Sequence, residues 1–186
     1  MPLLRQIAQL GHPVLRIPAA SVAAPASDAI RALIDDLLVT LADAGGVGIA
    51  APQVYESSAL FIVTSRATPS FPDAPVMEPE IVINPEILER SGGIVKGWEG
   101  CLSIPGIRGD VPRHLRIRVR YQTVDGRIVD RNFDGFIARV FQHEDDHLRG
   151  LVFLDRLESS RDVITEKEYQ KRVASMTRTA QPKGET

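Results

Sequence analysis

Two stretches of the chain repeat apolar residues with the period of an α-helix. In residues 27–44 the spacing is i, i+3, i+4, i+7, which is typical of an amphipathic helix with one buried face. The apolar positions are Ile30, Leu33, Ile34, Leu37, Leu38 and Leu41. Ser27 or Asp28 can cap the start of this helix, and Gly45 and Gly46 supply a stop. The sequence therefore predicts a helix that ends at a glycine-rich loop.

Strand patterns occupy the middle of the chain. Residues 59–64 and 81–83 are short apolar runs, and each indicates a strand, the second cut by the Asn-Pro pair at 84–85. In residues 115–124, arginines alternate with apolar side chains, which is the period-two pattern of a half-buried strand. The Asp-Gly pair at 125–126 then predicts a hairpin turn and a returning strand.

The second helical stretch follows this hairpin. The Asp-Gly pair at 134–135 ends the returning strand, and apolar positions then keep helical spacing up to a stop at Gly150. Residues 161–176 predict a third, mostly polar helix, and residues 177–186 a flexible tail.

Composition and charge narrow the class of protein. A chain of 186 residues, 44% hydrophobic and 25% charged, fits one soluble globular domain, which we place at residues 1–176. The formal net charge of -2 provides no basic excess for general nucleic-acid or anionic-membrane binding. We see no signal-peptide stretch, and no window approaches the roughly 20 apolar residues that cross a bilayer. We therefore expect a cytoplasmic protein.

The sequence QHEDDHL at residues 142–148 carries the first candidate chemistry. His143 and His147 are four residues apart on the predicted helix, so both imidazoles project from one face within reach of one divalent cation. In the pattern HExxH, the glutamate between the histidines is a base that takes a proton from water and returns it to the leaving nitrogen. Glu144 holds that position. A catalytic site of this kind also needs a third protein ligand.

The single cysteine, Cys101, is a candidate for that third ligand. It cannot form an internal disulfide, and its surroundings, GWEGCLSIPG, favour a loop over a core strand. An isolated cysteine more often packs as a small hydrophobic side chain, so a buried structural thiol is the alternative. Two other functions are compatible with the HExxH pattern. One is a zinc endopeptidase with Glu158 as third ligand, and the other is a binding module that holds metal or peptide without catalysis.

Three motifs in one order resemble the signature of the peptide deformylase family. They are GVGIAAPQ at residues 46–53, EGCLS at 99–103 and QHEDDHL at 142–148, with weaker similarity in LGHPVLR and GLVFLDRL. An endopeptidase would leave the first two motifs unexplained. The resemblance implies hydrolytic removal of the formyl group from N-formylmethionine at the start of new polypeptides, with release of formate.

The family's functional residues can be carried over position by position. The resemblance implies that Glu144 is the general acid and base. The Gln53 side-chain amide and the Leu102 backbone N–H are implied to bind the carbonyl oxygen as it gains negative charge. The implied metal ligands are Cys101, His143 and His147.

The resemblance also implies roles around the reacting groups. Gly48 matches a glycine whose backbone approaches the substrate. Glu99 and Arg108 match a carboxylate and an arginine that pair beneath the site and hold the cysteine loop, whereas Arg113 matches the family without a catalytic role. We expect the methionine pocket to be formed by Val47, Phe136, Val140 and the stem of Arg139.

Three further polar residues are expected to lie outside the ligand set. The side chain of Asp146 points about 100 degrees away from His147 around the helix, so we expect a supporting or structural role. His12 and His114 lie outside the motifs, and neither is proposed as a ligand.

The metal, the partners and the architecture complete these expectations. One thiolate and two imidazoles accept iron, zinc, nickel or cobalt. The resemblance implies Fe2+ in the cell, with Zn2+, Ni2+ or Co2+ in purified protein. We expect a monomer that acts on N-formylmethionyl peptides and associates transiently with the ribosome. The implied fold is α+β, with antiparallel strands around the helix that carries HEDDH and with the N-terminal and C-terminal helices packed outside.

Overall fold

The protein is described by a computed structural model, which covers residues 1–68 and 74–179. The helices are α1 (Asp28–Ala44), α2 (Gly135–Leu148) and α3 (Glu166–Thr179). The strands are β1 (Gly48–Ala50), β2 (Leu60–Ser65), β3 (Met77–Cys101), β4 (Ile104–Gln122), β5 (Ile128–Asp134) and β6 (Val163–Thr165). Short 3-10 turns occupy η1 (Pro13–Arg16), η2 (Ala51–Val54), η3 (Phe153–Arg156) and η4 (Ser160–Asp162).

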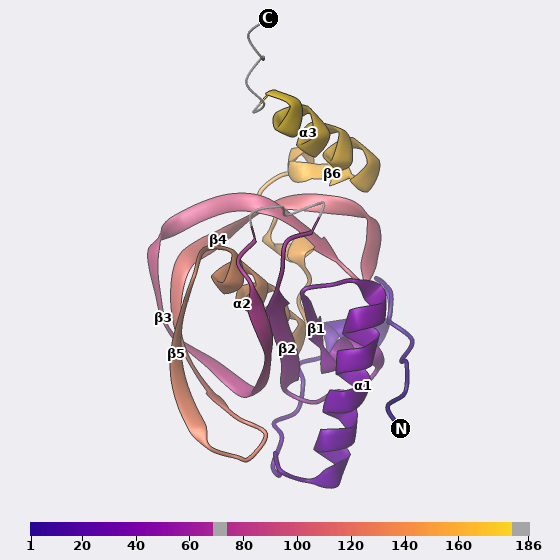
Figure 1. The fold of residues 1–186 in the computed structure, drawn as a ribbon, viewed down its shortest axis with the longest axis vertical. Helices are drawn as coiled ribbons and strands as arrows, with labels where there is room; N and C mark the ends of the chain where they lie inside the picture. The colour runs from indigo at the N-terminus through magenta and orange to yellow at the C-terminus, as the bar shows by residue number, and fades with distance from the viewer. Residues whose placement is uncertain (69–73, 180–186) are drawn as a thin grey trace, which may run out of the picture.

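The strands form one antiparallel sheet in the order β1-β2-β3-β4-β5, with β6 paired to β4. This sheet curves around α2, which contacts β1, β2, β4 and β5 (Figure 1). Helix α1 packs outside against β1 and β2, and α3 lies beside β4 and β6. The predicted α+β arrangement around the second helix is therefore confirmed.

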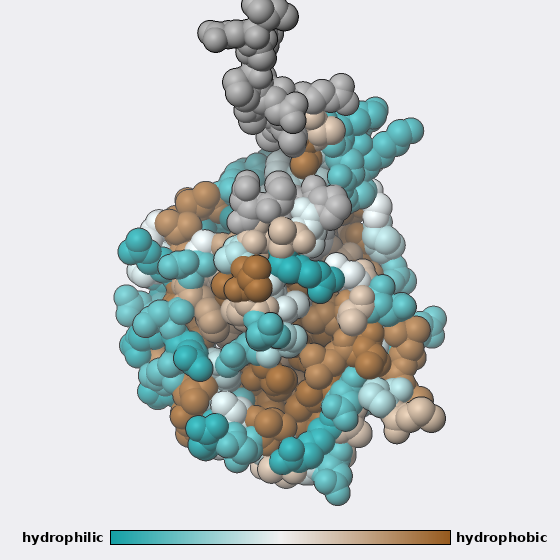
Figure 2. Space-filling model, in the orientation of Figure 1, coloured by the Kyte–Doolittle hydropathy of each residue, from teal (hydrophilic) through white to brown (hydrophobic). Residues whose placement is uncertain are grey.

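The surface follows the period-two pattern of the strands. On the face in Figure 2, hydrophilic residues predominate over β3 and β5, while apolar residues gather between β5 and α1. Two of the arginines that alternate along β4 meet acidic partners across the sheet: Arg118 lies 3.6 Å from Glu89, and Arg120 lies 2.8 Å from Asp130. Such exposed pairs contribute little to stability, so they mainly keep this face solvated.

Helix α1 forms where the apolar spacing predicts it. The Ser27 side chain accepts a hydrogen bond from the Ile30 N–H at the start of the helix. Gly45 ends it with a φ of 66°, the left-handed conformation that glycine adopts without a Cβ clash. The buried face, including Leu37 at 0% exposure, packs against the apolar residues of β1 and β2. The helix thus delivers the glycine-rich motif to one edge of the sheet.

Strand β3 is much longer than predicted, and the expected break at residues 84–85 is wrong. Asn84 has a φ of 50°, and the pairing register shifts there. The side-chain amide of Asn84 makes hydrogen bonds at this irregular point of the strand. Its Oδ1 atom accepts from the Val22 N–H at 2.8 Å, and its Nδ2 atom donates to the Gln122 side chain at 2.6 Å. An asparagine and a proline at a bulge therefore redirect the strand without ending it.

The β3–β4 hairpin also corrects the predicted loop around Cys101. Residues 99–101 complete β3, and Cys101 pairs with Ile104 across a tight turn, so only Leu102 and Ser103 leave the ladder. The strand predicted at 115–124 corresponds to the far end of β4, which already ends at Gln122. The hairpin turn after it is confirmed by the bond from the Thr123 N–H to the Arg127 carbonyl at 2.9 Å.

Helix α2 is confirmed, and it carries more buried polar side chains than is usual for a helix enclosed by a sheet. Residues 142–147 are all polar, and all are less than 9% exposed. Burying polar groups is unfavourable unless each finds a partner. The sequence of this helix therefore requires a matching set of charges and donors in the surrounding strands.

The C-terminal part departs from the sequence-based boundaries. The helix predicted from residue 161 begins at Glu166, because η4 and β6 precede it. It extends to Thr179, so residues 177–179 are helical, and the rest of the predicted tail lies outside the described residues. No helix in the described ranges is long and apolar enough to span a membrane.

Candidate active site

Cys101, His143 and His147 meet at the end of the β3–β4 hairpin. Their candidate ligand atoms all lie within 4.8 Å of one another, and Cys101 Sγ is 3.3 Å from His147 Nε2. Helix α2 places both imidazoles on one face, and the turn at residues 102–103 places the thiol opposite them. One sulfur and two ring nitrogens at this spacing fit a divalent transition-metal ion.

The charges around this cluster favour the form of cysteine that binds metal. Burial opposes ionisation of Cys101, but His147 and His143 outweigh it and lower the pKa of the thiol to about 5. Burial also opposes protonation of His143, yet Cys101 and Glu99 raise its pKa above the ordinary value. A metal ion binds cysteine as the thiolate and histidine as the neutral imidazole, so metal binding releases any protons that the imidazoles carry.

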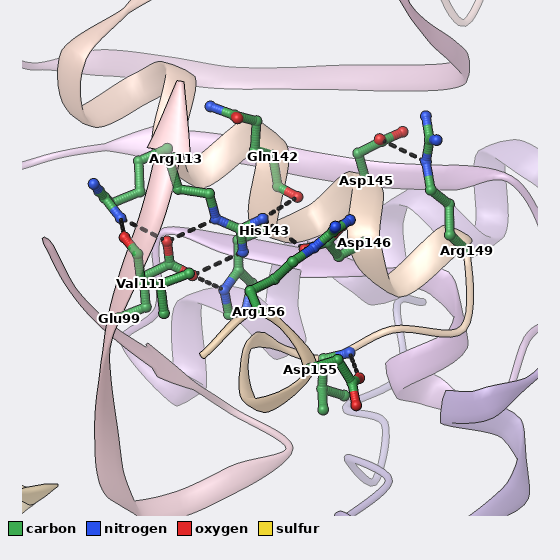
Figure 3. Close-up of polar contacts among 12 residues, drawn as sticks. Glu99, Val111, Arg113, Gln142, His143, Asp145, Asp146, Arg149, Asp155 and Arg156 are labelled. Atoms are coloured by element: carbon green, nitrogen blue, oxygen red, sulfur yellow. Dashed lines mark hydrogen bonds and ion pairs between the residues drawn. The ribbon is translucent and has the colours of Figure 1, made fainter. Parts of the chain in front are cut away.

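Glu99 fixes the orientation of one candidate ligand. Its Oε2 atom lies 2.9 Å from His143 Nδ1, and this hydrogen bond leaves Nε2 of the ring to face the cluster (Figure 3). Burial would raise the pKa of the Glu99 carboxyl, but Arg113 and His143 outweigh burial and lower it to about 2. The residue is therefore a buried carboxylate that depends on its partners.

The arginine that pairs with Glu99 is Arg113, and the expected pairing with Arg108 is wrong. Arg113 donates to both carboxylate oxygens, from Nε to Oε1 at 2.9 Å and from Nη2 to Oε2 at 3.0 Å. Glu99 is opposite Gly109 in the β3–β4 ladder. Because side chains alternate between faces, Arg113 shares the face of Glu99, whereas Arg108 projects from the other face. Arg108 pairs with Glu166 of α3 at 2.6 Å.

The network continues from Arg113 into α2. Its Nη1 atom donates to Asp146 Oδ2 at 2.6 Å, and Asp146 also accepts from Arg156 Nε at 3.0 Å (Figure 3). Asp146 is therefore joined to Glu99 through their shared partner Arg113, which is consistent with the expected supporting or structural role. The alternating charges join β3, β4, α2 and η3 in one buried cluster.

Arg139 lines the cavity beside the cluster and also forms contacts that were not expected from the sequence. The guanidinium donates to Glu99 Oε1 at 2.9 Å and to the backbone carbonyls of Val111 and Val95 at 2.7 and 2.6 Å. Gly97 gives it room, because a Cβ there would lie 2.9 Å from Arg139 Cζ. Arg139 thus ties α2 to both strands of the hairpin.

Glu144 lies in the same helix, between the two histidines. It is buried, and its Oε2 atom has no hydrogen-bond partner among the described residues. Burial raises the pKa of this carboxyl to about 7. Gly48 of β1 makes the space, because a Cβ there would lie 2.3 Å from Glu144 Oε1. This close contact explains the glycine at position 48 without reference to a substrate.

Gln53 reaches the cluster from η2. Its Oε1 atom accepts from the Ala50 N–H at 2.9 Å, and Nε2 donates to Ser103 Oγ at 3.1 Å. Nε2 is also 3.6 Å from Cys101 Sγ, which places the amide beside the Leu102 turn. Ser103 was not singled out from the sequence, although its position directly after Leu102 in EGCLS was an available signal.

A cavity of about 500 Å³ opens onto these groups. Of the site residues expected from the sequence, His147 does not line the cavity; it is fully buried behind the others. Sequence reasoning missed the outer wall, where Trp98 of β3 lies together with Glu166 and Gln170 of α3. These residues carry no motif, and the pairing of β6 with β4 brings α3 to the cavity.

The other candidate ligands lie elsewhere. Glu158, the third ligand of the endopeptidase alternative, is exposed and pairs with Lys96 at 2.8 Å. His12 accepts a hydrogen bond from the Val14 N–H in η1, and the His114 backbone N–H donates to the Gln142 side chain. Within the described residues, the group that could hold a metal ion consists of Cys101, His143 and His147.

Comparison with known proteins gives the family. The model of the family described as Polypeptide deformylase matches residues 4–163. The chain belongs to the peptide deformylase family. Peptide deformylases are metal-dependent hydrolases that remove formyl groups from nascent peptides. The endopeptidase and the silent binding module are thereby set aside.

Individual peptide deformylases are similar over most of their length. Peptide deformylase 2 of Nostoc sp. is 53% identical over 177 residues, which cover 95% of this chain and 99% of the relative. The Met-Ala-Ser-bound class I type b peptide deformylase of Acinetobacter baumannii has a TM-score of 0.82 at 44% identity, covering 84% of this chain and 100% of that one. The enzyme of Thermus thermophilus has a TM-score of 0.74 at 38% identity, covering 95% of both chains.

The corrected ion pair predicts unequal losses of stability. Arg113→Met leaves Glu99 and Asp146 buried without their shared cation, so the free energy of unfolding should fall by about 3 to 5 kcal/mol. Arg108→Met breaks a pair whose Glu166 side chain is 38% exposed, and the loss should be about 1 kcal/mol. Urea denaturation of both variants at equal metal content measures the difference. Equal losses would contradict the assigned pairing.

The contact between Gly48 and Glu144 predicts a loss of activity without unfolding. In Gly48→Ala, the added Cβ displaces the Glu144 carboxylate, so kcat for formate release should fall about 100-fold, as for a lost general base. Ile49→Val, the adjacent change in β1, removes one buried methylene and serves as control. Circular dichroism checks that both variants are folded. Full activity of Gly48→Ala would show that the position of Glu144 is unimportant.

Proposed function

We propose that the cavity hydrolyses the formyl–methionine amide at the N-terminus of nascent polypeptides, with Cys101, His143 and His147 as ligands of one divalent metal ion. The observation that carries this proposal is the buried Glu144 carboxylate beside the three candidate ligands. When bound, the ion supplies Lewis acidity, which lowers the pKa of a water molecule and polarises the formyl carbonyl.

Glu144 is the proposed general base and acid. A carboxyl group with a pKa of about 7 can take a proton near neutral pH and release it again. It accepts the proton of the attacking water and then donates a proton to the methionine nitrogen as the carbon–nitrogen bond breaks. The products are formate and a peptide with a free amino group, so atoms and charge balance.

Gln53 and Leu102 are the proposed hydrogen-bond donors to the carbonyl oxygen. The Ala50 N–H and Ser103 Oγ hold the Gln53 amide in one orientation before a substrate arrives. A donor fixed in advance stabilises the developing negative charge without reorganisation during the reaction. The backbone N–H of Leu102, in the adjacent turn, is the second donor in this proposal.

The shape of the cavity supports a methionine-first peptide as substrate. Val47, Phe136 and Val140 give part of its wall an apolar surface that suits an unbranched thioether side chain. A volume of about 500 Å³ also leaves room for the residues that follow. The related enzyme from Acinetobacter baumannii binds Met-Ala-Ser, the peptide that would remain after deformylation of formyl-Met-Ala-Ser.

The proposed metal in the cell is Fe2+. The ligand set of one thiolate and two imidazoles also accepts Zn2+, Ni2+ or Co2+, so the metal found after purification reflects supply as well as affinity. Elemental analysis of protein purified without oxygen from cells grown in minimal medium tests this proposal. Zinc as the predominant metal under those conditions would contradict it.

The function predicts formate release from formyl-Met-Ala-Ser by iron-loaded protein handled without oxygen. Glu144→Ala should lower kcat by at least about 100-fold while the metal stays bound. Unformylated Met-Ala-Ser is the substrate control and should yield no formate. Wild-type protein that is folded and metal-loaded but releases no formate would refute the proposed substrate.

We also propose transient association with the ribosome in the cytoplasm, where formylated chains emerge. The segment around α3 exposes basic residues, including Arg161 and Lys167. Deleting this segment would be a poor test, because Glu166 and Gln170 line the cavity. Activity and association would then change together.

Charge reversal separates these two effects. Arg161→Glu combined with Lys167→Glu should reduce co-sedimentation with ribosomes severalfold, because these charges would contact phosphates, and should spare hydrolysis of formyl-Met-Ala-Ser. Arg127→Glu, in the exposed β4–β5 turn, is the control for general charge effects. If the wild-type protein, the double variant and the Arg127→Glu control co-sediment equally, the proposal that the segment around α3 contacts the ribosome is wrong.

A further inference from the structure

The N-terminal segment connects α1 with two parts of the cavity. We call residues 3–10 the N-terminal brace; they form neither helix nor strand and begin alongside α1 (Figure 1). Four backbone N–H groups of the brace donate to groups far away in the sequence. A segment without secondary structure that makes this many specific tertiary bonds is fixed by its partners.

The first end of the brace is anchored on α1. The Leu3 N–H donates to Asp36 Oδ1 at 2.6 Å, and the Arg5 N–H donates to Thr40 Oγ1 at 3.0 Å. The Arg5 side chain adds a bond from Nε to Asp36 Oδ2 at 2.7 Å. Asp36 and Thr40 are one helical turn apart and both buried. Two polar side chains on the otherwise apolar face of α1 thus have the brace as their partner.

The second end reaches the two segments that hold the proposed oxyanion donors. The Ala8 N–H donates to the Gln53 carbonyl at 2.8 Å, and the Leu10 N–H donates to the Ser103 carbonyl at 2.8 Å. Ala8 is fully buried between them. The Gln9 side chain also contacts the Leu102 carbonyl at 3.4 Å. Two amides of one short segment therefore hold two motifs that are distant in the sequence.

The distance between these motifs matters for the reaction. Gln53 lies in η2 and Leu102 in the β3–β4 turn, so no shared element fixes their separation. Oxyanion donors act only when both lie at hydrogen-bond distance from one oxygen, and small displacements are costly. The bond from Gln53 Nε2 to Ser103 Oγ joins the side chains, whereas the brace joins the backbones.

We propose that the N-terminal brace is a positioning element of the reaction, which sets the separation of Gln53 and Leu102 through the amides of Ala8 and Leu10. This inference rests on the proposed roles of Gln53 and Leu102. The brace does not touch the reacting atoms. Loosening it should lower kcat while KM and metal content stay unchanged, because the cavity wall and the metal ligands remain.

Replacing one backbone amide by an ester tests the proposal. Incorporation of leucic acid at Leu10 removes the N–H that donates to Ser103 and keeps the side chain. The same replacement at Leu4 is the matched control, because its N–H makes no hydrogen bond within the described part of the chain. The ester at residue 10 should lower kcat about tenfold, and the ester at residue 4 should not. Equal kcat values for the two esters would overturn the proposal.

A double-mutant cycle distinguishes positioning from general loosening. If the brace acts through the Gln53 amide, the ester at Leu10 should have a much smaller effect on kcat in the Gln53→Ala background. Multiplicative effects of the two changes would overturn the proposal. Unchanged kcat in Gln53→Ala alone would instead refute the proposed role of Gln53, which separates the two failures.

A second variant covers the case in which the ester protein does not fold. Asp36→Ala releases the α1 end of the brace from outside the cavity and leaves all amides intact. It should lower kcat in the same direction, with KM and metal content unchanged, and Asp35→Ala on the exposed face of α1 is its control. If folded Asp36→Ala has the kcat of the wild type, the N-terminal brace does not position the reacting groups.

Discussion

The structure depends on keeping the carboxylate of Glu99 ionised inside the protein. A buried charge is strongly unfavourable unless cations and donors surround it. Glu99 has three such partners: Arg113 from β4, and Arg139 and His143 from α2. These contacts close the hairpin onto the helix. Because the same carboxylate bonds to His143 Nδ1, the interaction that joins the two elements also orients a candidate metal ligand.

This constraint explains why a polar helix can occupy the centre of a curved sheet. Residues 142–147 would be unsuited to a core by themselves, yet each face of the helix meets complementary groups. One face meets Glu99 and Cys101, and another places Asp146 between Arg113 and Arg156. Glu144 Oε2 and His147 Nδ1 are the exceptions, because each is a buried atom without a hydrogen-bond partner in the described residues. That unsatisfied carboxylate is the group to which the proposed mechanism gives the proton.

The proposed catalytic groups therefore come from elements whose relative positions are fixed by different kinds of contact. Salt bridges join α2 to the β3–β4 hairpin, and β1 approaches Glu144 closely because Gly48 lacks a side chain. Hydrogen bonds from residues 8 and 10 join the turn at 102–103 to Gln53. Preorganisation of this kind lets donors act without rearrangement during the reaction. The free energy needed to order these groups is therefore supplied by folding, before a substrate binds.

The sequence alone determined the helices that carry the site and the three candidate metal ligands. Helical spacing located α1 and α2, and the His143–His147 spacing placed two imidazoles on one face, because these properties depend on neighbours in the chain. Only the tertiary structure decided which partners meet. Strand register assigned Arg113 to Glu99, the Asn84 side chain kept β3 continuous, and pairing of β6 with β4 brought α3 to the cavity. These outcomes depend on contacts between segments far apart in the chain, which local periodicity cannot specify.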